Sequence, residues 1–345
     1  MLNVIKPHCL KPGDTIATVS LSWGGAGDEE LRWRYDLGKQ RLTEQFGLKV
    51  IEMEHTLKGT KYLSEHPEKR ASDLMQAFSD PAVKGIFSCI GGNDSIRLLP
   101  FVDVAVIANN PKVFLGYSDS TITHLMCLKA GLSSFYGPSI LAEFAENNGI
   151  FSYTVNHLQK ILFETNPVGQ IKASEEWTGH YLAWTKENAK VSKKMEKNGP
   201  YRFLQGKGTV QGHLIGGCLD VLEMAKGTSL WIDDSLFDGA ILFFETSEEM
   251  VRPALFESWL RDYAMQGILQ KAKGMVFGKP YQGIFQQEYE QAIRNVLQEF
   301  SLFSLPVVCN LSFGHNEPMC ILPYGAKAEL DCDHQTFSIL ESGVV

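Results

Sequence analysis

The chain has 345 residues, and its 44% hydrophobic and 21% charged residues are the proportions of an ordinary globular protein, with a length that suggests two domains. A formal net charge of −8 argues against a nucleic-acid partner, because such proteins depend on clustered Lys and Arg. No run approaches the roughly 18 apolar residues of a membrane span, and the N-terminus has no basic segment followed by an apolar stretch. We therefore expect a cytoplasmic protein without a membrane partner.

The seven cysteines are widely spaced and include no C-x-x-C pair that would suggest a zinc site or a redox dithiol. Cys89, Cys127 and Cys309 lie in apolar runs, where cysteine usually serves as a small core residue. We expect these thiols to be buried and reduced.

The first half of the chain alternates short apolar runs with helical patterns. Such alternation predicts βαβ units and a mostly parallel sheet, although the order of strands within the sheet cannot be inferred from it. The expected strands cover residues 15–21, 49–53, 85–90 and 113–115, and the expected helices cover residues 28–46, 72–78, 95–101 and 121–128.

Polar and charged residues dominate between about residues 167 and 208, and an Asn-Gly-Pro turn signal falls at 198–200. We interpret this stretch as a connection between domains. The charge run around Lys193 is typical of a solvated face. Trp177, Tyr181 and Trp184 recur at helical spacing, and they serve either to pin the segment to a domain or to stack on a ligand.

The apolar pattern resumes at residue 209 and predicts a second α/β unit with its own core. Strands are expected over residues 240–244, 274–277 and 306–310, and helices over 253–263 and 286–300. The expected division is therefore an N-terminal domain over 1–165, an insertion over 166–208 and a C-terminal domain over 209–345.

One serine stands at a strand-to-helix turn. Residues 113–121 have the sequence VFLGYSDST, in which an apolar strand passes through glycine to Ser118 and directly into a helix. Such a turn exposes the hydroxyl and points the first N–H groups of the helix toward the position of an oxyanion. Helix capping by Ser118 or Asp119 would explain the same residues without catalysis, and Ser120 replaces the final glycine of the usual G-x-S-x-G motif.

A serine nucleophile needs a base that is itself oriented by an acceptor. Of nine histidines, His315 is the one that follows an expected strand in a glycine-punctuated loop. Glu245 ends the apolar run over 240–244, where a carboxylate must find a partner or raise its pKa. Glu248 and Glu249 are expected to face water. A solvated strand end and an ordinary loop histidine remain the alternatives.

Two glycine loops follow strands. The loop at 90–95, IGGNDS, lets backbone approach a substrate closely, and the Gly92 N–H is a candidate oxyanion donor. The loop at 23–28, WGGAGD, suggests dinucleotide binding, with Glu52 and Glu54 as candidate ribose ligands. Glu30 stands at the third-glycine position, which weakens this nucleotide-dependent oxidoreductase interpretation.

Seven motifs occur in the order of one known family: FSDP at 78–81, GGNDSIRLLP at 91–100, GYSDST at 116–121, YGP at 136–138, GHLIGGCL at 212–219, FETSEE at 244–249 and GH at 314–315. Together they resemble the LD-carboxypeptidase family, and within it the branch of the microcin C self-immunity peptidases. The resemblance implies an N-terminal flavodoxin-like domain, a smaller C-terminal α/β domain, and a site between them. It also implies a homodimer and no metal or organic cofactor.

The resemblance implies a catalytic triad in which Ser118 is the nucleophile, His315 the general base and acid, and Glu245 the orienting carboxylate. The backbone N–H groups of Gly92 and Asp119 would form the oxyanion hole.

Three further residues are candidates for substrate binding. The insertion places Trp177 and Trp184 where that branch has aromatic residues against an adenine base, and Tyr136 of the YGP motif is the third candidate.

The cell-wall recycling members of the family have R-G-G-Y-G at the first glycine loop, whereas this chain has CIGGND at 89–94. We therefore expect a serine carboxypeptidase acting on a peptidyl or aminoacyl-nucleotide amide. A muramoyl-tetrapeptide L,D-carboxypeptidase is the first alternative. A non-catalytic ligand-binding protein on the same fold is the second, since fold does not fix function.

Overall fold

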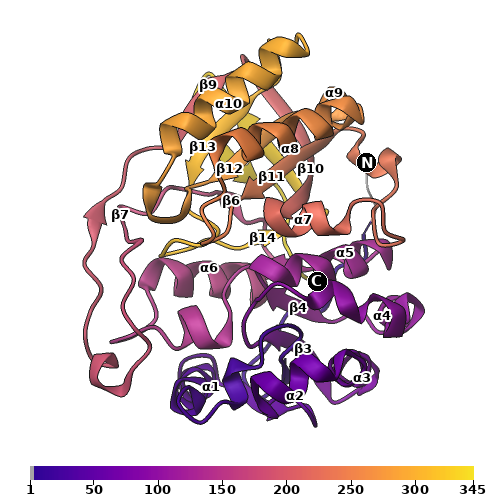
Figure 1. Cartoon of the computed structure of the whole chain (residues 1–345), viewed down its shortest axis with the longest axis vertical. Coiled ribbons are helices and arrows are strands. Elements are labelled where there is room, and N and C mark those ends of the chain that lie inside the picture. The colour runs from indigo at the N-terminus through magenta and orange to yellow at the C-terminus, as the bar shows by residue number, and fades with distance from the viewer. Residues whose placement is uncertain (1–3) are drawn as a thin grey trace.

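The computed structural model describes residues 4–345, which form two α/β layers stacked along the long axis of the molecule (Figure 1). The first layer contains a six-stranded sheet of order β14-β5-β4-β3-β1-β2. Five of its strands are parallel, and β14 pairs antiparallel with β5. The strands are β1 (Thr15–Val19), β2 (Lys49–Glu52), β3 (Val83–Ser88), β4 (Val113–Gly116), β5 (Phe135–Tyr136) and β14 (Leu322–Pro323).

Helices cover this sheet, so its central strands are apolar on both faces, and every residue of β4 is buried. The α-helices of the layer are α1 (Arg32–Phe46), α2 (Gly59–Glu65), α3 (Pro67–Ser79), α4 (Val104–Asn109), α5 (Thr121–Lys129) and α6 (Ser152–Leu162). Shorter helical turns are η1 (Gly25–Gly27), η2 (Ser95–Phe101), η3 (Ser118–Ser120) and η4 (Ile140–Phe144), the last of which is π-helical.

The second layer contains an eight-stranded sheet of order β6-β16-β15-β10-β11-β12-β13-β9. Its four central strands are parallel, and the outer strands are antiparallel to their neighbours. The strands are β6 (Gly169–Gln170), β9 (Arg202–Gln205), β10 (Thr209–Cys218), β11 (Ala240–Glu245), β12 (Gly274–Gly278), β13 (Val307–Leu311), β15 (Lys327–Asp331) and β16 (Thr336–Ile339).

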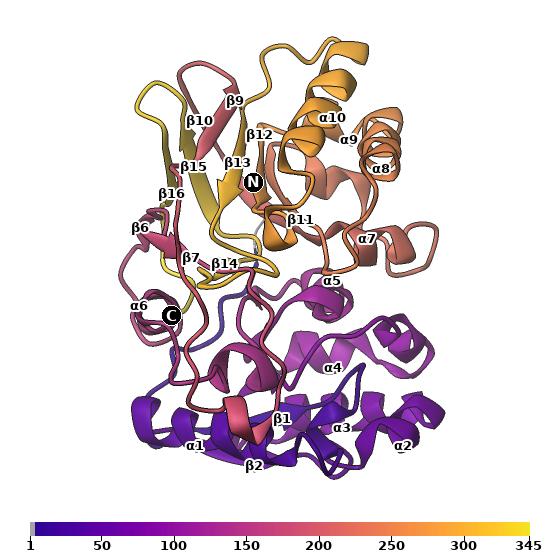
Figure 2. The ribbon, with the colours of Figure 1, turned by 60° about the vertical axis from the view of Figure 1, so that its left-hand side comes forward.

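Figure 2 shows the α-helices of this layer on one face of the second sheet. They are α7 (Leu219–Ala225), α8 (Pro253–Met265), α9 (Ile268–Lys271) and α10 (Gln286–Glu299), with η6 (Asp234–Phe237) and η7 (Tyr281–Gly283) between them. None of the helices within residues 4–345 is long and apolar enough to cross a bilayer.

The predicted mixed α/β fold with a mostly parallel first sheet is confirmed, and the predicted elements recur with shifted ends. The largest shifts are at helices: α1 begins at Arg32 rather than at residue 28, and α3 at Pro67 rather than at 72. Asp28 does not cap α1, because its carboxylate accepts a 2.8 Å hydrogen bond from the Thr60 N–H. Pro67 occupies the first turn of α3, where its missing N–H costs nothing. The three cysteines predicted in the core are buried, and all seven are free.

The stretch over 166–208 connects the layers along one side of the molecule (Figures 1 and 2). Its two ends join the second sheet as β6 and β9, while β7 (Glu176–Trp177) and β8 (Glu196–Lys197) pair with each other. The turn η5 (Lys186–Asn188) reaches the first layer, where the Asn148 N–H donates to the Ala189 carbonyl at 3.0 Å. The stretch therefore spans the gap between the two sheets.

Candidate active site

Ser118 lies at the carboxyl end of β4 and begins η3, in the strand–turn–helix arrangement that the sequence predicts. Its φ of 59° is in the left-handed region, a conformation that costs a non-glycine residue of order 1–3 kcal/mol and is concentrated at functional sites. Position 91 of the neighbouring loop must be glycine, because a Cβ on Gly91 would lie 2.9 Å from the Ser118 Cβ. The turn thus presents Ser118 beside the Gly91 backbone.

The structure brings Ser118, His315 and Glu245 together from three distant segments. His315 Nε2 lies 3.0 Å from Ser118 Oγ, and His315 Nδ1 lies 2.7 Å from Glu245 Oε2. Ser118 and Glu245 stand at the carboxyl ends of β4 and β11, and His315 follows β13 by four residues. These distances are those of a nucleophile hydrogen-bonded to a base that a carboxylate orients.

Tyr136 closes this arrangement into a ring of hydrogen bonds. Its hydroxyl donates to Glu245 Oε1 at 2.5 Å and accepts a 3.0 Å hydrogen bond from the Ser118 N–H. The substrate-binding role predicted for Tyr136 is therefore at odds with its position, because the side chain is 1% exposed and its polar atom is committed to Glu245 and Ser118. Sequence reasoning located the residue but not its contacts.

Glu248 is a neighbour of His315 that sequence reasoning missed. Its Oε2 lies 2.9 Å from His315 Nε2, although the Glu248 side chain is 59% exposed. Burial works against a charged imidazole, but Glu245 and Glu248 outweigh it and raise the pKa of His315 well above its ordinary value. In return, the hydrogen bond with His315 lowers the pKa of Glu248 to about 2. Glu248 is exposed, as the sequence predicts, but one of its carboxylate oxygens also contacts His315.

The loop at Gly91 and Gly92 packs beside the start of η3. A Cβ on Gly91 would lie 3.3 Å from the Asp119 nitrogen, and Gly92 has a φ of 143°. The Asp119 carboxylate accepts a 2.8 Å hydrogen bond from the Ser95 N–H, which ties the glycine loop to the turn that begins at Ser118. The two predicted oxyanion donors, Gly92 and Asp119, are therefore on adjacent segments next to Ser118.

Ser118 and His315 open into a cleft of about 900 Å³ that both layers and the insertion line. Trp184 and Tyr181 from the insertion lie on its wall together with Trp23 from the first layer. The rings of Trp23 and Trp184 are stacked with centroids 6.4 Å apart, and the Arg34 guanidinium lies 4.5 Å from the Trp184 centroid. Sequence reasoning noticed Trp23 only as the start of a glycine loop.

Trp177 does not line this cleft with Trp184. Its ring centroid lies 4.1 Å from Lys279 Nζ, and the next residue, Thr178, exchanges two backbone hydrogen bonds with Glu317 at 2.7 and 3.0 Å. This bridge fixes the insertion to the loop that carries His315. The structure thus gives Trp177 the alternative role of pinning the segment.

Lys193 also departs from its expected place on a solvated face. Its side chain is 13% exposed and forms ion pairs with Glu146, at 2.8 Å, and with Glu317. A partly buried lysine between two carboxylates is held in place by its charge, so Lys193 anchors the far end of the insertion to both layers.

Two family models match the chain: the LD-carboxypeptidase N-terminal domain over residues 16–137, and the LD-carboxypeptidase C-terminal domain over residues 211–330. The microcin C7 self-immunity protein MccF of Escherichia coli is 30% identical over 338 residues, which cover 96% of this chain and 94% of that protein. The chain belongs to the LD-carboxypeptidase family.

Solved structures of the family share this fold along nearly its whole length. An MccF-like protein from Streptococcus pneumoniae, in complex with AMP, has a TM-score of 0.87 at 33% identity and covers 95% of this chain and 98% of its own. MccF in complex with aspartyl sulfamoyl adenosine has a TM-score of 0.85 at 28% identity and covers 99% of this chain and 100% of its own.

In this LD-carboxypeptidase family member, the loop that suggested a dinucleotide has a packing explanation. A Cβ on Gly24 would lie 2.7 Å from the Gly59 backbone, and one on Gly27 would lie 2.4 Å from it. Glu52, a predicted ribose ligand, accepts hydrogen bonds from Lys39 and Tyr35 instead. Close approach of two backbone segments accounts for the glycines without a nucleotide.

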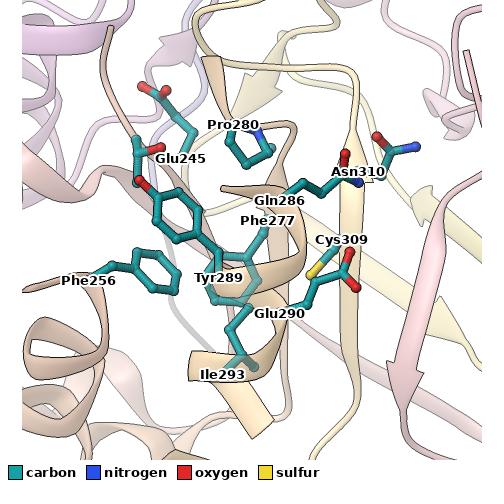
Figure 3. A pocket seen from close by; sticks show the side chains of 12 residues that line it. Glu245, Phe256, Phe277, Pro280, Gln286, Tyr289, Glu290, Ile293, Cys309 and Asn310 are labelled. Atoms are coloured by element: carbon teal, nitrogen blue, oxygen red, sulfur yellow. The ribbon is translucent and has the colours of Figure 1, made fainter. Parts of the chain in front are cut away.

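A second cavity lies behind Glu245, between β11, β12, β13, α8 and α10 (Figure 3). In Figure 3 the Glu245 carboxylate points away from the rings of Phe256 and Tyr289, which line the cavity. Its volume of about 20 Å³ has room for a single water molecule. A peptide or nucleotide cannot enter it, so in this family member the cleft at Ser118 is the candidate active site.

Proposed function

We propose that this chain is a serine-type amidohydrolase with carboxypeptidase activity, in which Ser118, His315 and Glu245 form the catalytic triad. The observation that carries the proposal is the pair of distances at His315, 3.0 Å to Ser118 Oγ and 2.7 Å to Glu245 Oε2. Membership of the LD-carboxypeptidase family supports it.

The proposed reaction has two steps. In the first, Ser118 Oγ attacks the amide carbonyl while its proton passes to His315 Nε2, and the C–N bond breaks as His315 returns that proton to the leaving amine. In the second, water gives a proton to His315 and attacks the acyl carbonyl, and the bond to Ser118 Oγ breaks as His315 returns that proton to Ser118, which releases the acid. Glu245 stabilises the imidazolium in both steps through its 2.7 Å contact with Nδ1.

The developing oxyanion needs preorganised donors, and we propose the N–H groups of Gly92 and Asp119 for this role. Among the backbone hydrogen bonds that residues 4–345 make outside helices, none has the N–H of Gly92 or Asp119 as its donor. Both belong to segments that flank Ser118, so they can point at one oxygen of a bound amide.

Substitution of Ser118 tests the proposal directly. Ser118→Ala is expected to lower turnover by roughly 10⁴-fold, because the nucleophile is lost while binding is kept. Ser120→Ala, two residues further along in the same turn, is the matched control and should keep near wild-type turnover. Unchanged activity in Ser118→Ala would end the proposal.

For the substrate, we propose an aminoacyl-nucleotide amide. A relative binds AMP and another binds aspartyl sulfamoyl adenosine. In this chain the stacked rings of Trp23 and Trp184 line the cleft, and stacking on a base is worth about 1–3 kcal/mol. A planar base on this aromatic wall would leave the aminoacyl end to reach Ser118.

A comparison of two amides tests this substrate class. We expect higher kcat/KM for an aminoacyl sulfamoyl adenosine than for an L,D-tetrapeptide of the cell-wall type. Trp184→Leu should lower the first value about tenfold, equivalent to about 1.4 kcal/mol of stacking, and leave the second unchanged. Trp177→Leu, whose ring lies outside the cleft, is the control. Preferential cleavage of the tetrapeptide would favour a muropeptide carboxypeptidase instead.

The homodimer implied by the family resemblance and the cytoplasmic location expected from the sequence remain part of this proposal. Sedimentation of the purified chain would test the first, and fractionation of the producing cell the second.

A further inference from the structure

His315 has a carboxylate at each of its two nitrogens. Glu245 lies 2.7 Å from Nδ1, and Glu248 lies 2.9 Å from Nε2, the nitrogen that also faces Ser118 Oγ at 3.0 Å. A neutral imidazole carries only one N–H, so both carboxylates are satisfied only when His315 is an imidazolium. In this arrangement Nε2 has no lone pair with which to take the Ser118 proton.

The two carboxylates differ in freedom. Glu245 is the last residue of β11 and is 2% exposed, whereas the Glu248 side chain is 59% exposed in the loop between β11 and α8. Met250 in the same loop has a φ of 49°, and Met250 is 37% exposed. Glu248 can therefore turn into the cleft or into water without disturbing the core, while Glu245 cannot.

The wall around Glu248 carries more negative than positive charge. Asp220, Glu248 and Glu249 all line the cleft, and within residues 4–345 none of them has a Lys or Arg partner within 4.0 Å. Among residues 4–345, Lys193 is the one lysine that lines the cleft, and it is already paired with two glutamates. A cleft wall of one sign raises the local concentration of ligands of the opposite sign.

We propose that, in the substrate-free protein, Glu248 keeps His315 protonated and inactive by contacting Nε2. A positively charged group next to the scissile amide draws Glu248 away, and His315 can then act on Ser118. This inference rests on the proposed function and adds a substrate class to it, namely amides of a cationic amino acid such as lysine. On release of Glu248, the Nε2 proton passes to solvent and the lone pair faces Ser118.

The titration of His315 depends on every group around it, and Glu248 is the one that can leave. The others are fixed. They are Glu245 from β11, Tyr136 from β5 acting through Glu245, Tyr117 and Ser118 from the end of β4, and the Glu317–Lys193 pair, of which Glu317 belongs to the same loop as His315.

Glu248→Gln tests the resting state without any need for turnover. This change keeps the shape of the side chain and removes its charge, so the pKa of His315 should fall by about one unit or more. NMR titration of the full chain, with the His315 resonance assigned by its loss in His315→Gln, measures the shift. Glu249→Gln removes a neighbouring charge that does not contact His315 and should leave the titration close to that of the wild type. Equal titration of His315 in the wild type and Glu248→Gln would overturn the inference.

The same variant should shift the pH profile of kcat/KM to lower pH. The base form of His315 is the one that reacts, so kcat/KM rises with pH through the pKa of the free enzyme. Removal of the Glu248 charge lowers that pKa and moves the rising limb to lower pH by about one unit, about tenfold in rate on the limb for an uncharged substrate. A limb that stays in place, or moves to higher pH, contradicts the proposal.

Three aminoacyl sulfamoyl adenosines that differ in charge test the substrate class. The wild type should cleave the lysyl compound about tenfold faster in kcat/KM than the norleucyl compound, and the glutamyl compound slowest, because an attraction worth about 1.4 kcal/mol is a tenfold preference. Glu248→Gln should reduce the differences in kcat/KM among the three compounds. Preference for the glutamyl compound, or an order unchanged in Glu248→Gln, would sink the inference.

Failure of the proposed function is distinguishable from failure of this inference. If Ser118→Ala cleaves amides normally, the triad is wrong, whereas the NMR titration still reports whether Glu248 controls the charge on His315.

Discussion

Ser118 takes part in two hydrogen bonds that lead, through different atoms, to the same carboxylate. Its Oγ contacts His315, which contacts Glu245, and its N–H contacts Tyr136, which also contacts Glu245. A ring of this kind fixes the hydroxyl and the backbone of one residue together. The strained φ of Ser118 is therefore supported from both sides.

Tyr136→Phe removes one member of this ring and nothing else. The buried Ser118 N–H and one oxygen of Glu245 both lose their partner, which costs about 1–3 kcal/mol for each unsatisfied group. We expect a lower melting temperature together with a roughly tenfold lower kcat, because the carboxylate is then held at one oxygen only.

Tyr324→Phe is the matched control, since its buried hydroxyl donates to the Gly216 carbonyl at 2.7 Å and has no contact with His315. It should lower the melting temperature and keep kcat. Wild-type kcat in Tyr136→Phe would show that the ring is structural only.

At the scale of elements, the site is assembled where parallel strands end. β4 and β11 belong to different sheets, yet their carboxyl ends deliver Ser118 and Glu245 to one place, and the loop after β13 adds His315. That loop passes close to Glu245 at Gly314, whose φ is 95°. A side chain at this point would meet the carboxylate.

Gly314→Ala tests how tightly the loop and β11 are matched. The new Cβ would lie 2.7 Å from Glu245 Oε2, so either the loop or the carboxylate must move. A displacement of about 1 Å at a catalytic group is enough to cost about 10²-fold in rate, and we expect a loss of kcat of that order.

Gly227→Ala is the control that separates backbone strain from displacement of the carboxylate. Gly227 also has a positive φ, 74°, but a Cβ there meets nothing within 4 Å. It should lose about 1–2 kcal/mol of unfolding free energy and keep its kcat. Equal activity in both variants would contradict the close match.

Sequence patterns could identify Ser118, Glu245 and His315 because each one interrupts or follows an apolar run, and such runs mark strand ends. Glu248 could not be placed in this way, because spacing along a loop does not determine which direction a side chain takes. Trp177 and Trp184 have the same residue type and polar surroundings in sequence, yet only Trp184 lines the cleft. Partners that come from distant segments, such as Lys279 for Trp177, decide between the two roles.

At the scale of the whole molecule, the cleft exists because two sheets face each other across a gap that the insertion bridges. Thr178 ties the insertion to the loop of His315, and Lys193 ties it to Glu146 of the first layer. The sequence predicted two α/β units and a connection between them, but not the contacts that hold this connection in place. Its fixed position follows from ion pairs and backbone contacts made only in the folded chain.

The order of strands in the sheets also could not be predicted from the sequence. Leu322 and Pro323 form β14 at the edge of the first sheet. Leu322 pairs with Tyr136 of β5, which lies 186 residues earlier in the chain (322 − 136). Two residues give no recognisable strand pattern of their own.

Because β14 is synthesised long after β5, the first sheet stays incomplete until near the end of translation. While the ribosome is still making the second half, β5 is an open edge to which the strand of another nascent chain can add. Arrival of β14 covers that edge, and Pro323, which has no N–H to offer, makes a poor template for further growth. A polypeptide cut short before Leu322 would keep the open edge for its lifetime, so aggregation of truncated products is the expected penalty for late completion of the first sheet.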